Sequence, residues 1–256
     1  MADAPLYLRE VSLRRGQVPD FGRYPFHLPV VATFERLVLE RPVTFLIGEN
    51  GSGKSTMLEA IAIALGFNAE GGSRNFRFGT RPSHSELHRY LQLVRGSARP
   101  RDGYFLRAES YYNLATEIER LDAEPAYSIP ISESYGSRAL HAQSHGESFL
   151  SLVEHRFRGR GLYLLDEPEA ALSPMRQMTL LAHLHQLAER DSQFLIATHS
   201  PILLGYPGAQ ILALEPNGLR AVAYEDTEHF RITRDFLNRY PAMLDTLLGN
   251  YPEALE

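Results

Sequence analysis

The segment GENGSGKS at residues 48–55 limits the possible folds of this chain more than any other feature. It matches the pattern G-x-x-x-x-G-K-[ST], in which backbone N–H groups of a glycine-rich loop surround phosphate oxygens. A short apolar, β-rich run at 43–47 precedes the loop, and residues 54–65 carry apolar side chains at helical spacing. A buried strand, a glycine loop and a helix N-terminus together form an anion site. The segment therefore predicts a nucleotide site in an α/β fold.

The lysine of this loop supports the same interpretation over a chance glycine-rich turn. Lys54 is the only lysine in the chain, and the other 25 of the 26 basic residues are arginine. Because arginine serves everywhere else, the compact ammonium of Lys54 fits a role against β- and γ-phosphate charge. Ser55 would ligate Mg²⁺. The predicted cradle for the nucleotide comprises Gly48, Glu49, Asn50, Gly51, Ser52, Gly53, Lys54, Ser55 and Thr56.

Composition limits the class of protein. A chain of 256 residues, 44% of them hydrophobic, suits one large α/β domain, or one domain with a subdomain. The absence of cysteine excludes disulfides and thiolate metal sites and fits a reducing compartment. The start MADAPLYLRE lacks the pattern of a signal peptide, and no apolar run approaches the roughly 20 residues that span a bilayer. We expect a soluble, cytoplasmic protein without direct membrane insertion.

The order of the predicted elements indicates the architecture. Residues 6–47 predict short antiparallel strands, and the alternation of strands and helices after the loop predicts a largely parallel sheet covered on both faces. We expect strands at 104–108, 162–165 and 193–198, a short helix at 86–94, and helices at 145–157, 174–190, 228–239 and 242–248. Pro216-Asn217-Gly218 predicts a hairpin. The helix at 174–190 is expected to bury Met175, Met178, Leu181, Leu184 and Leu187.

Two acids end the strand at 162–165. A carboxylate at the end of a strand beside the phosphate-loop strand is well placed to hold Mg²⁺, which suits Asp166. Glu167 follows it and would polarise a water molecule toward the γ-phosphate as a general base. The alternative is a strand that ends at two surface acids. The phosphate loop upstream favours the catalytic interpretation.

The segment SHGE at 144–147 permits two interpretations. Ser144 and Glu147 form the pattern of a capping box, which stabilises a helix start by about 1 kcal/mol. A capped helix N-terminus with Gly146 in its first turn is also an anion site.

Five segments, GENGSGKS, SHGE, LYLLDEP, ALS and ATHS, occur in this order between positions 48 and 200. They resemble the Walker A, signature, Walker B, D-loop and H-loop motifs of the ATP-binding cassette (ABC) ATPases. The form of the signature, with GENGSGKST and DEPEAALSP, resembles the soluble SMC/RecF-like branch, and the whole chain resembles the small, compact predicted ATPases of that branch. Only about 90 residues separate Lys54 from Ser144, without sustained heptads, so no coiled coil is expected.

The resemblance implies a fold and roles for particular residues. The fold would be a P-loop NTPase with a largely parallel sheet, an antiparallel N-terminal β-region and a helical, arginine-rich subdomain at approximately 67–157, within one ABC head domain over 1–256. Ser144 and Gly146 would hold the γ-phosphate bound to a second copy, and His199 would contact the γ-phosphate in its own copy. Glu109 stands in the strand where this family usually has a metal-sensing glutamine, so we consider it a third candidate metal residue.

The implied activity is ATP hydrolysis with Mg²⁺ by a head-to-tail homodimer that forms on ATP binding. By analogy it would drive nucleic-acid repair or defence. The alternatives are a motor subunit of a membrane ABC transporter and a nucleotide-gated switch that binds a protein partner.

One further segment bears on partners. Eight arginines lie between Arg74 and Arg107, against Glu86 and Asp102, in a chain whose net charge is −5. Such a local excess predicts a phosphate-binding face for nucleic acid, or equally a solvated surface with internal ion pairs.

Overall fold

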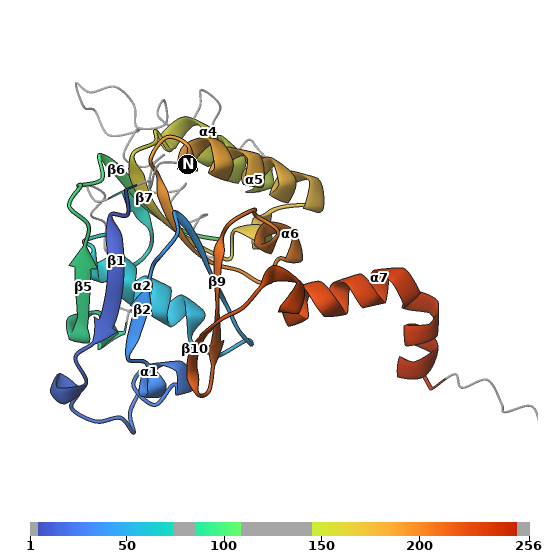
Figure 1. The fold of residues 1–256 in the computed structure, drawn as a ribbon, viewed down its shortest axis with the longest axis horizontal. Helices are drawn as coiled ribbons and strands as arrows, with labels where there is room; N and C mark the ends of the chain where they lie inside the picture. Colours follow the sequence, from blue (N-terminus) through green and yellow to red (C-terminus); the bar gives the residue numbers. More distant parts are fainter. Residues whose placement is uncertain (1–4, 74–84, 109–144, 250–256) are drawn as a thin grey trace, which may run out of the picture.

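The computed structural model describes residues 5–73, 85–108 and 145–249. Its main sheet has seven strands in the order β10-β9-β3-β8-β7-β6-β4 (Figure 1). The five strands from β9 to β6 run parallel, whereas β10 and β4 are antiparallel to their neighbours. The strands are β3 (Val43–Ile47), β4 (Gly72–Ser73), β6 (Asp102–Arg107), β7 (Gly161–Asp166), β8 (Gln193–Ala197), β9 (Gln210–Glu215) and β10 (Gly218–Ala221). The predicted largely parallel α/β sheet is confirmed.

Helices cover both faces of this sheet because successive side chains of a strand point to opposite sides. On one face Leu46, Leu164 and Leu195 join a core with α2 (Lys54–Ala64). On the other face Phe45, Leu165 and Ile196 form a second core with α4 (His145–Arg156) and α5 (Pro174–Ala188). Figure 1 shows α4 and α5 side by side on this second face.

A smaller antiparallel sheet of three strands, in the order β2-β1-β5, flanks α2. It consists of β1 (Leu8–Leu13), β2 (Arg36–Val38) and β5 (Leu91–Arg95). The predicted antiparallel N-terminal β-region is therefore present. Between β1 and β2 lie a 3₁₀ turn (Arg15–Gln17) and the short helix α1 (Pro29–Thr33).

The prediction of a helix at 86–94 is wrong. The segment instead forms a 3₁₀ turn (Glu86–Tyr90) and then β5, which pairs with β1 through Leu13↔Leu91 and Val11↔Leu93. Apolar residues at 87, 91 and 94 have helical spacing, but Leu91 and Leu93 also alternate with exposed Gln92. The open edge of β1 decides between the two patterns, because pairing satisfies a full row of backbone hydrogen bonds.

The buried face predicted for α5 is also partly wrong. Met175 and Met178 are 68% and 48% exposed, and the fully buried residues are Leu180, Leu184 and Leu187. At about 100° per residue, Met178 lies roughly 160° around the helix from Leu180, so both cannot face the same core. Ser173 and Pro174 stand at the predicted N-cap and first helical position, although the Ser173 side chain makes no capping hydrogen bond.

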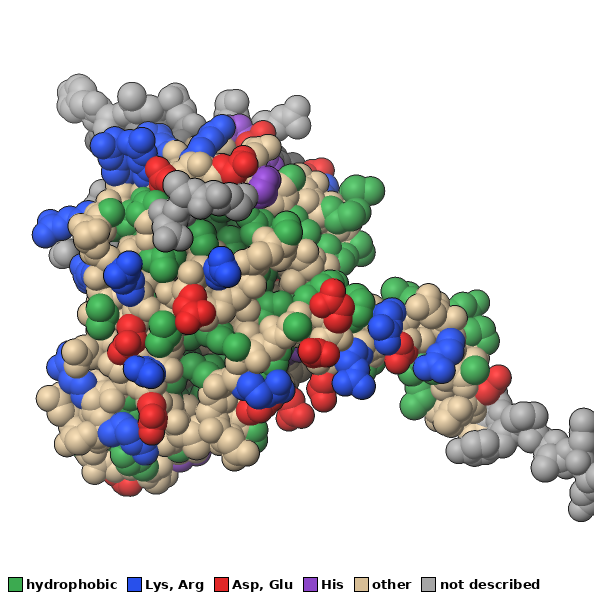
Figure 2. All heavy atoms as spheres, viewed as in Figure 1, with side chains coloured by type: hydrophobic (Ala, Val, Ile, Leu, Met, Phe, Trp, Pro, Cys, Tyr) green, Lys and Arg blue, Asp and Glu red, His purple; other side chains and the backbone are tan. Residues whose placement is uncertain are grey.

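The C-terminal part leaves the main sheet after the hairpin of β9 and β10, which was predicted from Pro216-Asn217-Gly218. Helix α6 (Pro201–Leu204) is short, and α7 (Glu228–Leu247) is kinked at Arg239, two residues before Pro241. This kink is where the sequence predicted a break between two helices. None of the residues of α7 is fully buried, and the helix projects from the body (Figure 1). Figure 2 shows apolar and basic side chains interleaved along it.

No helix in the described part of the chain has the length and apolarity needed to cross a membrane.

Candidate functional site

The predicted site residues meet at one edge of the main sheet. The phosphate loop follows β3, Asp166 ends β7, and His199 lies two residues after the end of β8. These three strands are parallel neighbours, so their carboxyl ends open onto the same crevice, where open α/β sheets bind ligands.

The loop itself has the backbone that its glycines allow. Gly53 has φ +101° and immediately precedes α2, where a Cβ would lie 2.7 Å from Cγ1 of Val30. A side chain at this position would therefore meet both backbone strain and a clash. A glycine loop that leads directly into a helix start is the backbone form that binds anions through N–H groups.

Lys54 lies inside its own loop. Its Nζ donates hydrogen bonds to the carbonyl oxygens of Gly48 (2.8 Å) and Glu49 (2.9 Å), and the residue is buried. Burial lowers the pKa of the Lys54 ammonium, while the nearby carboxylates of Glu167 and Asp166 act in the opposite direction. The only lysine of the chain is thus held inside the loop by two carbonyl oxygens, and its ammonium is the group there that suits a phosphate contact.

Ser55 and Asp166 form the predicted metal pair. The Ser55 hydroxyl donates to Oδ1 of Asp166 at 2.9 Å, and Asp166 is buried. A hydroxyl and a carboxylate are the hard oxygen ligands that Mg²⁺ prefers, so the residues present fit this ion.

An arginine that the sequence assigned to a surface patch lies beside this pair. Arg107 ends β6 directly opposite Asp166 in the parallel register of β6 and β7. Its Nη1 donates to Oε2 of Glu59 at 2.7 Å, and its Nε lies 3.5 Å from Oδ2 of Asp166. The side chains of Arg107, Glu59 and Asp166 are only 18%, 13% and 6% exposed. Arg107 is therefore a neighbour of the metal pair and not part of a solvated phosphate-binding face.

Glu167 leaves the strand in an unusual conformation. Its φ of +49° is left-handed, which costs a non-glycine residue about 1–3 kcal/mol. The turn is held by a hydrogen bond from its backbone N–H to the carbonyl of Ala197 (2.9 Å). Its Oε1 lies 3.9 Å from Nε2 of His199. The two residues predicted as catalytic thus face each other across the crevice.

Two residues that the sequence did not indicate support His199. Oε1 of Glu169 accepts the backbone N–H of His199 at 2.5 Å, and Nε2 of His229, at the start of α7, lies 3.2 Å from Nδ1 of His199. Nε2 of His199 is buried and has no hydrogen-bond partner in the described part of the chain. Glu169 belongs to the DEPE segment, so the motif could have indicated it as a site residue. Nothing in the sequence links His229 to His199, which lies 30 positions earlier.

Burial sets the charges of this group. It lowers the pKa values of His199 and His229, with Lys54 acting in the same direction, and it raises the pKa of Glu169. Both histidines are therefore neutral at pH 7, and the contact between His199 and Glu167 is not a charge pair at that pH. A neutral His199 presents one ring nitrogen to His229 and the other toward Glu167.

A cavity of about 950 Å³ adjoins the loop. Its walls are the loop residues 48–52, the turn after β9 and the first turns of α7, with His199 and His229 on one side. The phosphate loop thus has room beside it for a larger ligand.

The structure describes only some of the other residues predicted to belong to the site. Gly146 lies in the first turn of α4, and the Glu147 carboxylate accepts a hydrogen bond from Nη2 of Arg176 on α5 at 2.9 Å. Ser144 and Glu109 lie outside the described residues, as do residues 74–84 of the arginine-rich segment 74–107.

Comparisons with known proteins agree with this geometry. Residues 26–113 match a family model described as "AAA domain", and residues 139–205 match one described as "AAA domain, putative AbiEii toxin, Type IV TA system". A curated protein of Sulfurisphaera tokodaii, named "Putative ABC transporter ATP-binding protein", is 24% identical over 206 residues, which cover 74% of this chain. The chain spans 41% of the length of that relative.

Among solved structures, an ATP-binding cassette of an ABC transporter matches with a TM-score of 0.50 and 16% identity, covering 93% of this chain and 97% of that one. An SMC head domain from Thermotoga maritima matches with a TM-score of 0.42 and 16% identity, over 85% and 98% of the two chains. The chain therefore contains segments of the AAA-domain type and has the α/β P-loop fold of an ATP-binding cassette head.

Proposed function

We propose that this chain binds ATP with Mg²⁺ and hydrolyses it as an ABC-type ATPase of the SMC/RecF-like branch. The observation that carries the proposal is the convergence of Lys54, the Ser55–Asp166 pair, Glu167 and His199 at one edge of the sheet. The five side chains come from three separate motifs, and each has the chemistry that phosphoryl transfer to water requires.

The loop residues would bind the phosphates through backbone N–H groups and the Lys54 ammonium. Ser55 and Asp166 would hold Mg²⁺, which when bound neutralises charge on the phosphate oxygens. Glu167 would accept the proton of the attacking water, because its carboxylate is half-exposed and lies on the crevice side of the strand end.

His199 would donate a hydrogen bond to the terminal phosphate. Its Nε2 is the nitrogen without a partner among the described residues, and His229 contacts the other one. A neutral imidazole donates through one nitrogen only, so His229 would fix the tautomer by donating its own N–H to Nδ1 of His199.

The experiment that tests hydrolysis replaces the base and keeps the phosphate cradle. Glu167→Gln is expected to lower turnover by roughly 10²–10⁴-fold and to leave ATP affinity unchanged. Glu154→Gln is the matched control, since Glu154 is an exposed acid on α4. Lys54→Ala is expected to remove ATP binding itself, because the chain has no second lysine.

Steady-state turnover by Glu167→Gln within twofold of the wild type would show that Glu167 is not the base. Retained ATP binding by Lys54→Ala would contradict the assignment of the loop.

The work driven by hydrolysis is proposed from resemblance: a repair or defence process on nucleic acid. The name of the Sulfurisphaera tokodaii relative favours a second candidate, the motor subunit of a membrane transporter. Purification from native cells distinguishes them, since a transporter motor would copurify with an integral membrane protein and a repair or defence ATPase would not.

A further inference from the structure

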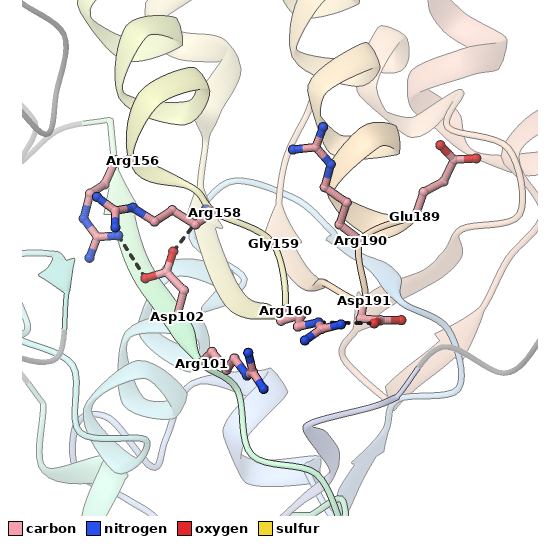
Figure 3. Close-up of a pocket in the computed structure, with 9 residues that line it drawn as sticks. All are labelled: Arg101, Asp102, Arg156, Arg158, Gly159, Arg160, Glu189, Arg190 and Asp191. Carbon is pink, nitrogen blue, oxygen red and sulfur yellow. Dashed lines mark hydrogen bonds and ion pairs between the residues drawn. The ribbon is translucent and has the colours of Figure 1, made fainter.

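A second cavity, of about 800 Å³, lies at the opposite end of the main sheet from the phosphate loop. Its walls are the residues that lead into the amino ends of three neighbouring parallel strands, β6, β7 and β8. Figure 3 shows the lining residues, which are Arg101, Asp102, Arg156, Arg158, Gly159, Arg160, Glu189, Arg190 and Asp191. We refer to it as the basic pocket.

Two of the five arginines in the basic pocket form ion pairs with acids of the same pocket. Arg156 donates to Oδ1 of Asp102 at 2.9 Å, and Nε of Arg160 lies 3.8 Å from Oδ2 of Asp191 (Figure 3). Burial acts to raise the pKa of Asp102, but Arg156 and the Tyr163 hydroxyl outweigh it and hold that pKa below its ordinary value. Asp102 therefore stays charged and keeps Arg156 in place.

The other three arginines of the basic pocket differ in their surroundings. Arg101, Arg158 and Arg190 are exposed, and none of them forms an ion pair within the described part of the chain. Against them the pocket offers one further acid, Glu189. The pocket thus carries a local positive excess on a chain whose net charge is −5.

Backbone hydrogen bonds fix Arg101, Arg160 and Arg190 of the basic pocket relative to one another. The N–H of Arg101 donates to the carbonyl of Arg160 at 2.8 Å, and the N–H of Arg160 donates to the carbonyl of Arg190 at 2.7 Å. Three arginines from separate segments are thereby joined in one row of hydrogen bonds. The backbone from which these guanidinium groups extend is therefore already ordered before an anion binds.

We propose that the basic pocket binds successive phosphates of a nucleic-acid backbone. The nine lining residues are arginines, acids and one glycine, so the pocket offers charge and hydrogen-bond donors but no aromatic face for a base or ring. Such a surface binds phosphates without reading sequence. With about 800 Å³ and five arginines, the pocket exceeds what one phosphate ester would fill.

The inference adds a binding surface to the proposed ATPase, and its nucleic-acid part rests on that proposal. Its test is therefore made without ATP. Binding of a fluorescent 20-nucleotide single strand is measured by anisotropy between 50 and 200 mM salt, for the wild type and for the triple variant Arg101→Gln/Arg158→Gln/Arg190→Gln. On a single strand each phosphate contact contributes about 0.7 to the slope of log K against log salt, so the triple variant is expected to flatten the slope by roughly 2.

The matched control is Arg36→Gln/Arg41→Gln/Arg231→Gln, which removes the same charge from exposed positions elsewhere. It is expected to keep the wild-type slope. The single variant Arg158→Gln, expected to flatten the slope by about 0.7, provides a second measurement if the triple variant folds poorly.

Absence of binding by the wild type at 50 mM salt, an unchanged slope in the triple variant, or equal flattening in the control would each overturn the proposal. Saturable binding of pyrophosphate without binding of the oligonucleotide would overturn it in favour of a small phosphate ligand. ATP turnover of the triple variant without nucleic acid is expected to stay within twofold of the wild type, so a failure of hydrolysis is distinguishable from a failure of this pocket.

Discussion

Arg107 places a permanent positive charge where the proposed site would receive a metal ion. Its guanidinium bridges Glu59 and Asp166, and all three side chains are largely buried. In a buried environment the repulsion between like charges is screened only weakly. Arg107 and Mg²⁺ would therefore compete for the Asp166 carboxylate.

We expect Arg107→Gln to bind Mg²⁺ more tightly, because the competing charge is gone. The concentration of Mg²⁺ that half-saturates its effect on the binding of a fluorescent ATP analogue should fall by about 3–10-fold, equivalent to roughly 0.6–1.4 kcal/mol. Arg107→Lys keeps the charge and should stay close to the wild type. A higher Mg²⁺ requirement in Arg107→Gln would instead identify Arg107 as a residue that orients Asp166 for the metal.

The sequence predicted Asp166, Glu167 and His199 as site residues because each belongs to a short motif whose residue types suggest a role. The sequence did not predict that Arg107 contacts Asp166. That contact depends on the register between β6 and β7, which only the folded sheet defines. His229 was missed for the same reason, since its contact with His199 depends on where α7 begins.

At the scale of elements, the phosphate loop depends on how closely α1 approaches it. Gly53 and Gly51 both have positive φ, +101° and +78°, but only Gly53 has a neighbour in the way, since a Cβ at that position would lie 2.7 Å from Cγ1 of Val30. Alanine at Gly51 would therefore cost backbone strain alone, whereas alanine at Gly53 would cost backbone strain and a steric clash.

We expect Gly51→Ala to lose about 1–2 kcal/mol of unfolding free energy, which is the cost of a left-handed alanine. Gly53→Ala should lose more, because Val30 must also move. The double variant Gly53→Ala/Val30→Ala, compared with Val30→Ala alone, should recover the steric part. Urea unfolding of the wild type and the four variants measures these differences, and equal losses for the two single glycine variants would show that Val30 exerts no constraint.

Elements were predicted well where local pattern and tertiary environment agree. Residues 43–65 are such a case, because an apolar run, a glycine loop and a helical stripe each demand the same structure. The segment 86–94 is the opposite case, since its apolar spacing fits a helix while the unpaired edge of β1 offers a strand partner. The buried face of α5 likewise depends on its angle against α4 and the sheet, which periodicity alone does not contain.

For the whole molecule, the resemblance to ABC ATPases predicts a nucleotide site shared by two copies. Residues 145–147 of the signature segment begin α4, which packs on the face of the sheet opposite to α2. A helix start on that face would complete the γ-phosphate site of a second chain.

We therefore expect Mg-ATP to join two chains, most clearly in Glu167→Gln, where hydrolysis does not remove the ligand. Light scattering should show twice the monomer mass for this variant with Mg-ATP and the monomer mass with ADP. Glu167→Gln combined with Lys54→Ala should remain monomeric as the control. A monomer under all conditions would rule out the head-to-tail arrangement.

The two ends of β6 belong to the two proposed sites. Asp102 at its start lines the basic pocket, and Arg107 at its end contacts Asp166, about 17 Å away for a strand that rises 3.3 Å per residue. Chains that pair at their phosphate loops would thus keep both basic pockets open, and the pair would be bivalent. For a polyanion long enough to reach both, the second attachment is governed by effective concentration and not by bulk concentration. ATP would in this way raise the affinity of the paired chains for a long strand, without changing any contact inside either pocket.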